Sequence, residues 1–186
     1  MQEHKIMKNE ICFNCGKKSM KVIKNKPYHF TECGLDNVEL HGITQYECKK
    51  CGENYVSIPN MEGLHLTIGK AICCKTNALL APKEIKFLRK ELHLKSKELA
   101  RRLGVSDTTV SRWENGKSPI LEGSDRFLRS LYMMFVSDQI EGPVRFDAVN
   151  LFKEIQMHRK PPKKLVKIEL NPPDWMGKNF DFCHVN

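Results

Sequence analysis

The sequence predicts an α+β protein in which a small β-rich N-terminal domain precedes an all-α domain. Three observations support this fold class. Two C-x-x-C-G motifs lie 32 residues apart near the N-terminus. Short segments rich in β-branched and aromatic residues follow the first motif, and turn residues separate them. From about residue 82 onward, apolar residues recur at helical spacing.

The cysteine motifs read "CFNCG", which contains Cys12 and Cys15, and "CKKCG", which contains Cys48 and Cys51. Each C-x-x-C can turn around one metal ion, and the glycine that follows eases the turn. Four thiolates are the tetrahedral ligand set of a structural Zn²⁺ site. We therefore expect one structural zinc ion per chain, held by these four cysteines, which stabilises the N-terminal domain.

Two other roles for these motifs fit the pattern less well. A thioredoxin-like redox motif is a single C-x-x-C, and a catalytic zinc ion needs an open position that four thiolates would fill. For the other cysteines we expect reduced thiols that pack as small apolar residues, with a zinc ligand as the alternative for Cys33. These cysteines are Cys33, Cys73, Cys74 and Cys183.

The predicted strands lie within residues 20–30, 38–48 and 54–59. A sheet of this size has a thin core, so the metal is expected to supply much of its stability. The alternating pattern of residues 38–48 could leave a strand edge that pairs with another chain. Residues 61–81 are predicted to be partly helical and to lead into the second domain. We place the domain limits at 1–72, 73–137 and 138–186.

The second domain is predicted to be helical, with helices near 82–93, 96–103, 107–114 and 124–135. The last of these carries an apolar stripe that we expect to form a homodimer interface. The stripe comprises Phe127, Leu128, Leu131 and Phe135. A further helix is expected from Val144 to Ile155, followed by a basic, proline-containing arm at 159–167 and a tail without a clear period.

The helices predicted at 96–103 and 107–114 have the spacing of a helix-turn-helix. Ala100 is small where the helices approach, Gly104 makes the turn, and Ser106 is expected to cap the second helix. Short polar side chains on its outer face would let that helix enter a major groove. The predicted DNA-contacting residues are Ser96, Arg101, Arg102, Ser106, Asp107, Thr108, Thr109, Ser111, Arg112 and Lys117.

Charge and composition agree with a nucleic-acid partner. The net charge is +9 and the sequence pI is about 9.1, which favours an anionic ligand such as double-stranded DNA. A lysine-rich solvated surface is the alternative. The sequence contains neither an apolar run of membrane-spanning length nor the pattern of a signal peptide, so we expect a cytoplasmic protein that does not bind membranes. It also lacks a recognisable catalytic constellation, which argues against an enzyme.

Two resemblances narrow the hypothesis. The segment "LHLKSKELARRLGVSDTTVSRWENGKSP" resembles the helix-turn-helix of the lambda-repressor-like, or XRE, class. It departs from that class at Ser96, where glutamine is usual, and at Lys95, where a threonine cap is usual. Together with "CFNCG" and "VELHGITQYECKKCGENY", the chain resembles the MqsA-type, or YgiT-type, zinc-finger antitoxins over roughly residues 12–135.

The second resemblance implies the antitoxin of a bacterial type II toxin–antitoxin system. In that family the zinc domain binds a small ribonuclease toxin, and the helix-turn-helix domain dimerises and represses its own operon. The alternative is a stand-alone zinc-containing transcriptional regulator without a toxin partner.

Overall fold

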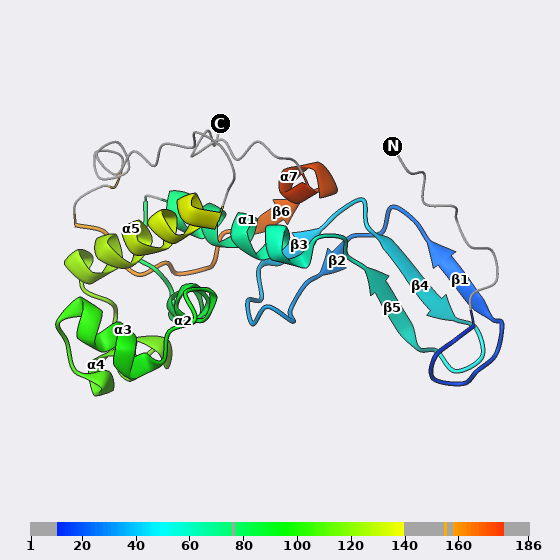
Figure 1. Cartoon of the computed structure of the whole chain (residues 1–186), viewed down its shortest axis with the longest axis horizontal. Helices are drawn as coiled ribbons and strands as arrows, with labels where there is room; N and C mark the ends of the chain where they lie inside the picture. The colour runs from blue at the N-terminus through cyan, green and yellow to red at the C-terminus, as the bar shows by residue number, and fades with distance from the viewer. Residues whose placement is uncertain (1–10, 76, 140–154, 156–157, 177–186) are drawn as a thin grey trace.

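The computed structural model describes residues 11–75, 77–139, 155 and 158–176. The molecule is elongated, with a β-rich region at one end and a helical region at the other (Figure 1). The long helix α1 (Met61–Cys74) runs between the two ends. This arrangement confirms the predicted fold class, a β-rich N-terminal part followed by a helical part. No helix among the described residues is long and apolar enough to cross a membrane.

The β-rich region contains two small sheets. The first is antiparallel, with the order β1-β4-β5, and contains β1 (Met20–Ile23), β4 (Thr44–Cys48) and β5 (Asn54–Ser57). The second has the order β2-β3-β6 and contains β2 (Tyr28–His29), β3 (Val38–Leu40) and β6 (Ile168–Leu170). Strand β6 pairs parallel with β3. The tail of the chain therefore completes a sheet that begins near the N-terminus.

The expectation that residues 38–48 leave an open strand edge is wrong. Strand β4 lies between β1 and β5, and β3 lies between β2 and β6, so both edges of each strand are paired. A β-strand with a neighbour on each side has no backbone groups left to pair with another chain. The open edges in this region belong to the outer strands instead.

The helical region follows the predicted pattern closely. It contains α2 (Pro82–Glu91), α3 (Ser96–Leu103), α4 (Asp107–Glu114) and α5 (Glu122–Gln139), and the short helix α7 (Pro172–Met176) lies after β6. The helix predicted over 144–155 lies outside the described residues, apart from Ile155, which is buried.

Helix α1 packs against α5 and α2 of the helical region and against α7, which follows β6. Its N-terminus is capped by Asn60, whose Oδ1 accepts the Gly63 N–H at 3.1 Å. At Gly69 it lies so close to α5 that an added Cβ would be 2.1 Å from the Tyr132 hydroxyl. Only glycine lets α1 and α5 approach to this distance.

A buried ionic cluster holds the end of α1 to α5. Arg129 is fully buried and donates to the carbonyl oxygens of Ile72, Cys73 and Lys75 at 2.7–2.9 Å. Its Nε lies 3.0 Å from Asp125 Oδ2. Arg129 therefore supplies the donors that the C-terminal carbonyls of α1 would otherwise lack.

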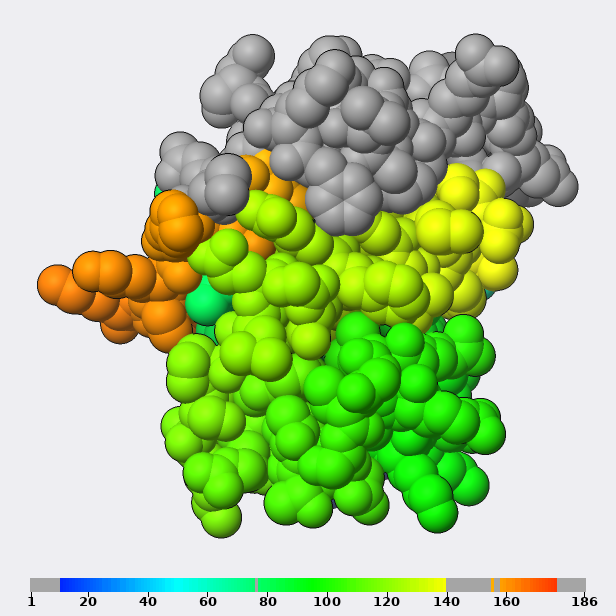
Figure 2. Space-filling view, turned by 90° about the vertical axis from the view of Figure 1, so that its left-hand side faces the viewer, coloured from blue at the N-terminus to red at the C-terminus, as the bar shows by residue number. Residues whose placement is uncertain are grey.

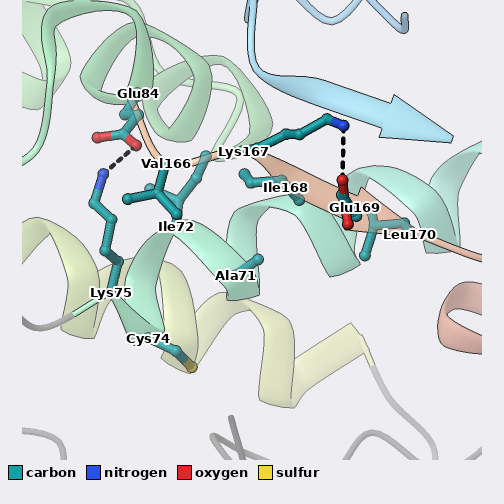
Figure 3. A pocket seen from close by; sticks show the side chains of 10 residues that line it. All are labelled: Ala71, Ile72, Cys74, Lys75, Glu84, Val166, Lys167, Ile168, Glu169 and Leu170. Atoms are coloured by element: carbon teal, nitrogen blue, oxygen red, sulfur yellow. Dashed lines mark hydrogen bonds and ion pairs between the residues drawn. The ribbon is translucent and has the colours of Figure 1, made fainter. Parts of the chain in front are cut away.

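A hollow of about 290 Å³ lies where β6 crosses α1 (Figure 3). Its wall is mainly apolar and includes Ile72, Val166 and Ile168. An ion pair between Lys75 and Glu84, at 2.5 Å, lies beside it. The hollow is thus a packing feature of the junction between β6 and α1.

Among the cysteines outside the two motifs, Cys73 is buried and Cys33 is half-buried, and both are free thiols as expected. Burial raises the pKa of Cys73 to about 12. The expectation of a free thiol at Cys74 is wrong, because this residue is disulfide-bonded. The expectation followed from the predicted cytoplasmic location, where thiols stay reduced. The spacing of cysteines in the sequence does not reveal which of them the fold brings together.

Candidate metal centre and nucleic-acid interface

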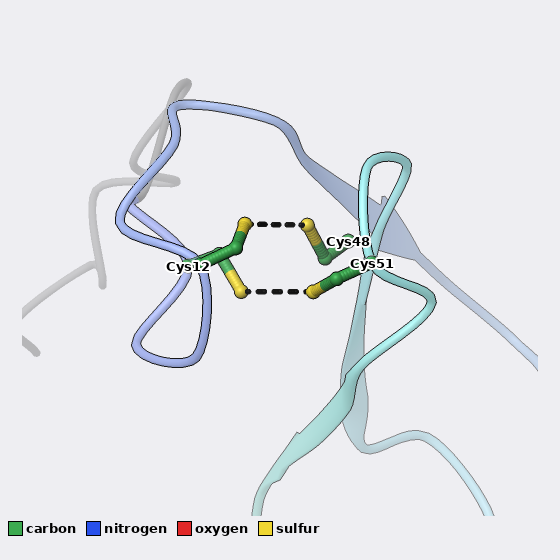
Figure 4. Close-up of side chains that lie close together, drawn as sticks. Cys12, Cys48 and Cys51 are labelled. Carbon is green, nitrogen blue, oxygen red and sulfur yellow. Dashed lines mark hydrogen bonds between the residues drawn. The ribbon is translucent and has the colours of Figure 1, made fainter.

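The four motif cysteines converge at the outer end of the first sheet (Figure 4). Cys12 and Cys51 have their Sγ atoms 3.6 Å apart, and those of Cys15 and Cys48 are 3.7 Å apart. All four Sγ atoms lie within 4.8 Å of one another. A tetrahedral site with metal–sulfur bonds of about 2.3 Å has sulfur–sulfur edges of about 3.8 Å. The cluster therefore has the dimensions of a closed, structural four-cysteine metal site.

Local hydrogen bonds favour at Cys12 and Cys48 the thiolate form in which cysteine binds metal. At Cys51 the backbone N–H of Glu53 acts in the same direction, but burial and the neighbouring thiols outweigh it and raise the pKa to about 12. A hydrogen bond with the Ser19 hydroxyl, at 2.9 Å, lowers the pKa of Cys48 to about 6. The backbone N–H of Cys15 lowers the pKa of Cys12 below its usual value. Gly16 and Gly52 adopt positive φ angles of 67° and 74°, as the tight turns after each motif require.

A second group of potential ligands, Glu39, His41 and Glu169, lies on the β3–β6 pair. A cation from the protein already lies among these residues. Lys167 Nζ is 2.9 Å from Glu39 Oε1 and 2.7 Å from Glu169 Oε1. These hydrogen bonds, with Glu169 first, raise the pKa of Lys167. The group is therefore explained as an ion-pair network between neighbouring strands.

An exposed apolar surface lies close to the metal centre. Phe13 is 89% exposed and Ile11 is 52% exposed, although both are large apolar residues. Phe13 packs edge-on against Tyr55, with ring centroids 5.7 Å apart. A hollow of about 250 Å³ beside them is lined by Ile11, Phe13, Met20, Tyr46, Tyr55, Val56 and Ser57. The sequence pattern did not single out this surface, because it forms only when the first motif folds against β5.

The helix-turn-helix is built by α3 and α4. Gly104 takes the left-handed conformation with φ 67°, and the Val105 N–H donates to the Ala100 carbonyl at 3.0 Å. Ala100 is 2% exposed, which lets the two helices approach closely. Ser106 caps α4 as expected, since its Oγ accepts the Thr109 N–H at 3.1 Å.

The inner face of α4 is fixed by packing and by one ion pair. Val110 and Trp113 are 0% and 2% exposed. Glu114 accepts two hydrogen bonds from Arg89 of α2, at 2.5 and 3.0 Å. A bidentate pair of this kind has a defined geometry. It therefore fixes the rotation of α4 about its own axis.

The outer face of α4 presents Asp107, Thr108, Ser111 and Arg112, all exposed. Ser106, which caps α4, is also exposed. Nearby, the exposed residues include Arg101, Arg102 and Lys117. Thr109 is half-buried, and its hydroxyl lies 2.8 Å from Ser106 Oγ. The hydroxyl oxygen of Ser96 is buried and has no hydrogen-bond partner among the described residues.

One polar residue of this face escaped the sequence reasoning. Asn115 is exposed at the C-terminal end of α4, and its Nδ2 donates to the Ser111 carbonyl at 2.7 Å. Its position just outside the predicted helix made it look like part of a loop. The side chain nevertheless continues the polar surface of α4.

The predicted apolar stripe of α5 divides between core and surface. Leu128 is fully buried, so it cannot belong to a dimer interface. Phe127 is 48% exposed, and Leu131 and Phe135 are half-buried. Two residues outside the predicted stripe, Leu121 and Met134, are 62% and 56% exposed. The exposed apolar residues of this region are therefore Phe127 and Met134 of α5 and Leu121, which directly precedes the helix.

Comparison with known proteins gives one finding. A family model described as "Helix-turn-helix" matches residues 85–121, which include α3, the turn and α4. No curated protein and no solved structure matches the chain. The match supports a DNA-binding transcription regulator and agrees with the resemblance to the XRE class.

Proposed function

We propose that this protein is a sequence-specific transcriptional repressor that reads its operator with the outer face of α4. One observation carries the proposal. Exposed polar side chains, including Thr108 and Arg112, stand on a helix whose opposite face is held by buried Val110 and Trp113. A rigid helix with short polar side chains and one arginine can enter a major groove and contact base edges. The net charge of +9 favours approach to DNA.

The exposed residues have two different roles in this proposal. Arg112 pairs with guanine and Thr108 contacts a base or a thymine methyl group. Asp107 accepts from a cytosine amine, while Ser106, Thr109 and Ser111 lie at the edges of the contact. Ser96 stands at the start of α3, and its buried hydroxyl oxygen is not part of the contact. Arg101, Arg102 and Lys117 contact phosphates, which position the protein without reading sequence.

Binding titrations on operator and random DNA, at two salt concentrations, test these roles. We expect Arg112→Ala to cost about 1–3 kcal/mol on the operator and little on random DNA. Arg102→Ala should weaken binding to both and flatten the salt dependence. Lys21→Ala, an exposed change at the far end of the molecule, is the matched control. Equal losses on both DNAs for Arg112→Ala would remove it from the base-reading residues.

The repressor is proposed to act as a homodimer that pairs through α5. Phe127, Leu121 and Met134 provide exposed apolar area on or beside this helix, and exposed apolar patches often mark protein contacts. Dimers of helix-turn-helix proteins place two recognition helices about one DNA turn apart. Light scattering of Phe127→Glu should give a monomeric mass, whereas Phe13→Glu should leave the dimer intact. A wild-type protein that stays monomeric with and without DNA would refute dimerisation.

The metal is proposed to be one zinc ion held by Cys12, Cys15, Cys48 and Cys51. Their spacing and the sulfur–sulfur distances of 3.6 and 3.7 Å support it. Elemental analysis of the purified protein should give one zinc per chain. A protein without stoichiometric zinc would refute the assignment.

The antitoxin role is the finer part of the proposal. It draws on the resemblance to MqsA-type antitoxins and on the exposed apolar surface around Phe13 and Ile11 beside the metal centre. A surface of this kind suits a protein partner such as a small ribonuclease toxin. Toxin binding there would leave α4, at the opposite end of the molecule, free to bind DNA (Figure 1).

Co-purification with the product of the adjacent gene tests the antitoxin role. We expect a complex that Phe13→Glu disrupts and Phe127→Glu does not. If the adjacent product does not bind and its expression alone is harmless, the chain is better described as a stand-alone zinc-containing regulator. The DNA-binding proposal would be unaffected by that result.

A further inference from the structure

The structure points to a second DNA-contacting element, the basic segment Lys160–Lys164, which we propose binds the phosphate backbone beside the site read by α4. The inference rests on the proposed DNA binding by α4 and assigns a role to a part of the chain outside the matched helix-turn-helix. Its residues read Lys-Pro-Pro-Lys-Lys, and all three lysines are exposed.

The segment is anchored firmly at its start. The side chain of Arg159 is 1% exposed, and its Nη2 lies 2.7 Å from Asp125 Oδ2, which is fully buried. Its Nη1 donates to the Ala78 carbonyl at 3.2 Å, and the Leu79 N–H donates to the Lys160 carbonyl at 3.2 Å. Arg159 thus locks the segment against the stretch that leads into α2.

The segment is anchored equally firmly at its end. Asn37 Nδ2 donates to the Val166 carbonyl at 2.6 Å, and β6 then pairs with β3. Two consecutive prolines, Pro161 and Pro162, favour an extended backbone at the start of the segment, and the chain then bends at Lys163 and Lys164. A segment held at both ends loses little conformational freedom when it binds a ligand.

The segment lies on the side of the molecule where α4 ends. A Cβ on Gly116, the residue before Lys117, would be 3.6 Å from Pro82, and Pro82 is three residues after Leu79. The backbone hydrogen bond from Leu79 to Lys160 then connects this stretch to the start of the basic segment. Figure 2 shows the basic segment (orange) projecting from one side of the helical region. DNA lying against α4 and Lys117 would therefore pass near it.

The charges of the segment are available for an anionic partner. Lys75, Lys83 and Lys167 each make an ion pair, whereas no ion pair joins Lys160, Lys163 or Lys164 to another residue that the structure describes. Four residue steps of at most about 3.1 Å place the three lysines within about 12 Å of one another. Along the helix axis, one strand of B-DNA presents three to four phosphates over that length. The lysines are therefore close enough together to contact neighbouring phosphates.

The test replaces all three lysines with alanine in the full-length protein and measures affinity against salt concentration on operator and random DNA. Three lost phosphate contacts should lower the salt slope by about 2.7. Between 50 and 200 mM salt, wild-type affinity should then fall about 40-fold more than that of the variant. The loss of affinity should be equal on both DNAs, because phosphate contacts carry no sequence information.

The matched control replaces Lys21, Lys24 and Lys26, which are exposed on β1 or in the connection from β1 to β2, within the β-rich region. It removes the same three charges, so it measures the effect of net charge alone. If the two triple variants behave alike while Arg112→Ala still weakens operator binding, the segment does not contact DNA and the proposed function stands. If the wild-type protein binds neither DNA, both proposals are refuted.

Discussion

Replacing Arg129 by methionine should destabilise the whole molecule, because this side chain joins α1 to α5. Arg129 is fully buried and pairs with Asp125 while donating to carbonyl oxygens at the end of α1. Removing one partner of a buried ion pair costs about 3–5 kcal/mol. Asp125 keeps Arg159 as a partner, at 2.7 Å, which favours the lower end of that range.

The carbonyls that lose their donor add to this cost. One buried carbonyl left unpaired costs about 1–3 kcal/mol. Counting only one of these carbonyls, about 3 kcal/mol for the ion pair and about 1 kcal/mol for the carbonyl give a lower bound of about 4 kcal/mol. A domain of ordinary stability has a free energy of unfolding of about 5–15 kcal/mol, so Arg129→Met should remove roughly a quarter or more of it. The thermal midpoint should fall by about 8–16 °C for a chain of this length.

Urea unfolding followed by tryptophan fluorescence measures the effect, since Trp113 and Trp175 are buried in α4 and α7. The matched control is Lys83→Met, which also replaces a cation with methionine but breaks an exposed ion pair with Asp36. That control should lose less than about 1 kcal/mol. A similarly small loss for Arg129→Met would refute the idea that the buried cluster holds the two helices together.

Three further predictions concern the core and the cysteines. Cys12→Ser should abolish stoichiometric metal binding and unfold the β-rich region, because bound metal of this kind supplies on the order of 10 kcal/mol. Elemental analysis measures the metal content and circular dichroism measures the folded structure; wild-type values for both would contradict this prediction. Gly69→Ala should cost about 1–3 kcal/mol through its clash with Tyr132, and combining it with Tyr132→Leu should recover part of that loss in urea titrations. Cys73, whose pKa burial raises to about 12, should resist iodoacetamide at pH 8 in the folded protein, since only about one thiol in 10⁴ is then ionised; peptide mapping that finds rapid alkylation would contradict its burial.

Local spacing was enough to predict the two sites that carry the proposed function. The C-x-x-C-G motifs identified the four cysteines that converge, because each motif places its own pair of thiols on one turn. The helix-turn-helix was equally predictable, since Ala100, Gly104 and Trp113 act over distances of one or two helical turns. Ser106 was predicted as a helix cap and caps α4 in the structure.

Contacts between distant parts of the chain were not predictable in this way. The tail after residue 158 shows no reliable period, yet it supplies β6 and a buried Trp175. Its parallel pairing with β3 joins residues about 130 positions apart, such as Val38 and Ile168. A three-residue strand is too short to leave a recognisable alternating pattern.

The sequence by itself determined the four-cysteine cluster and the helix-turn-helix, because their geometry is set within a few residues. The tertiary structure alone decided which strands are central, which face of α5 is exposed and where the basic segment lies. Arg159 illustrates the difference. In the sequence it is one of several basic residues before two prolines, but in the fold it pairs with Asp125 inside the protein. Burial of a charge depends on a partner that only the folded chain brings to it.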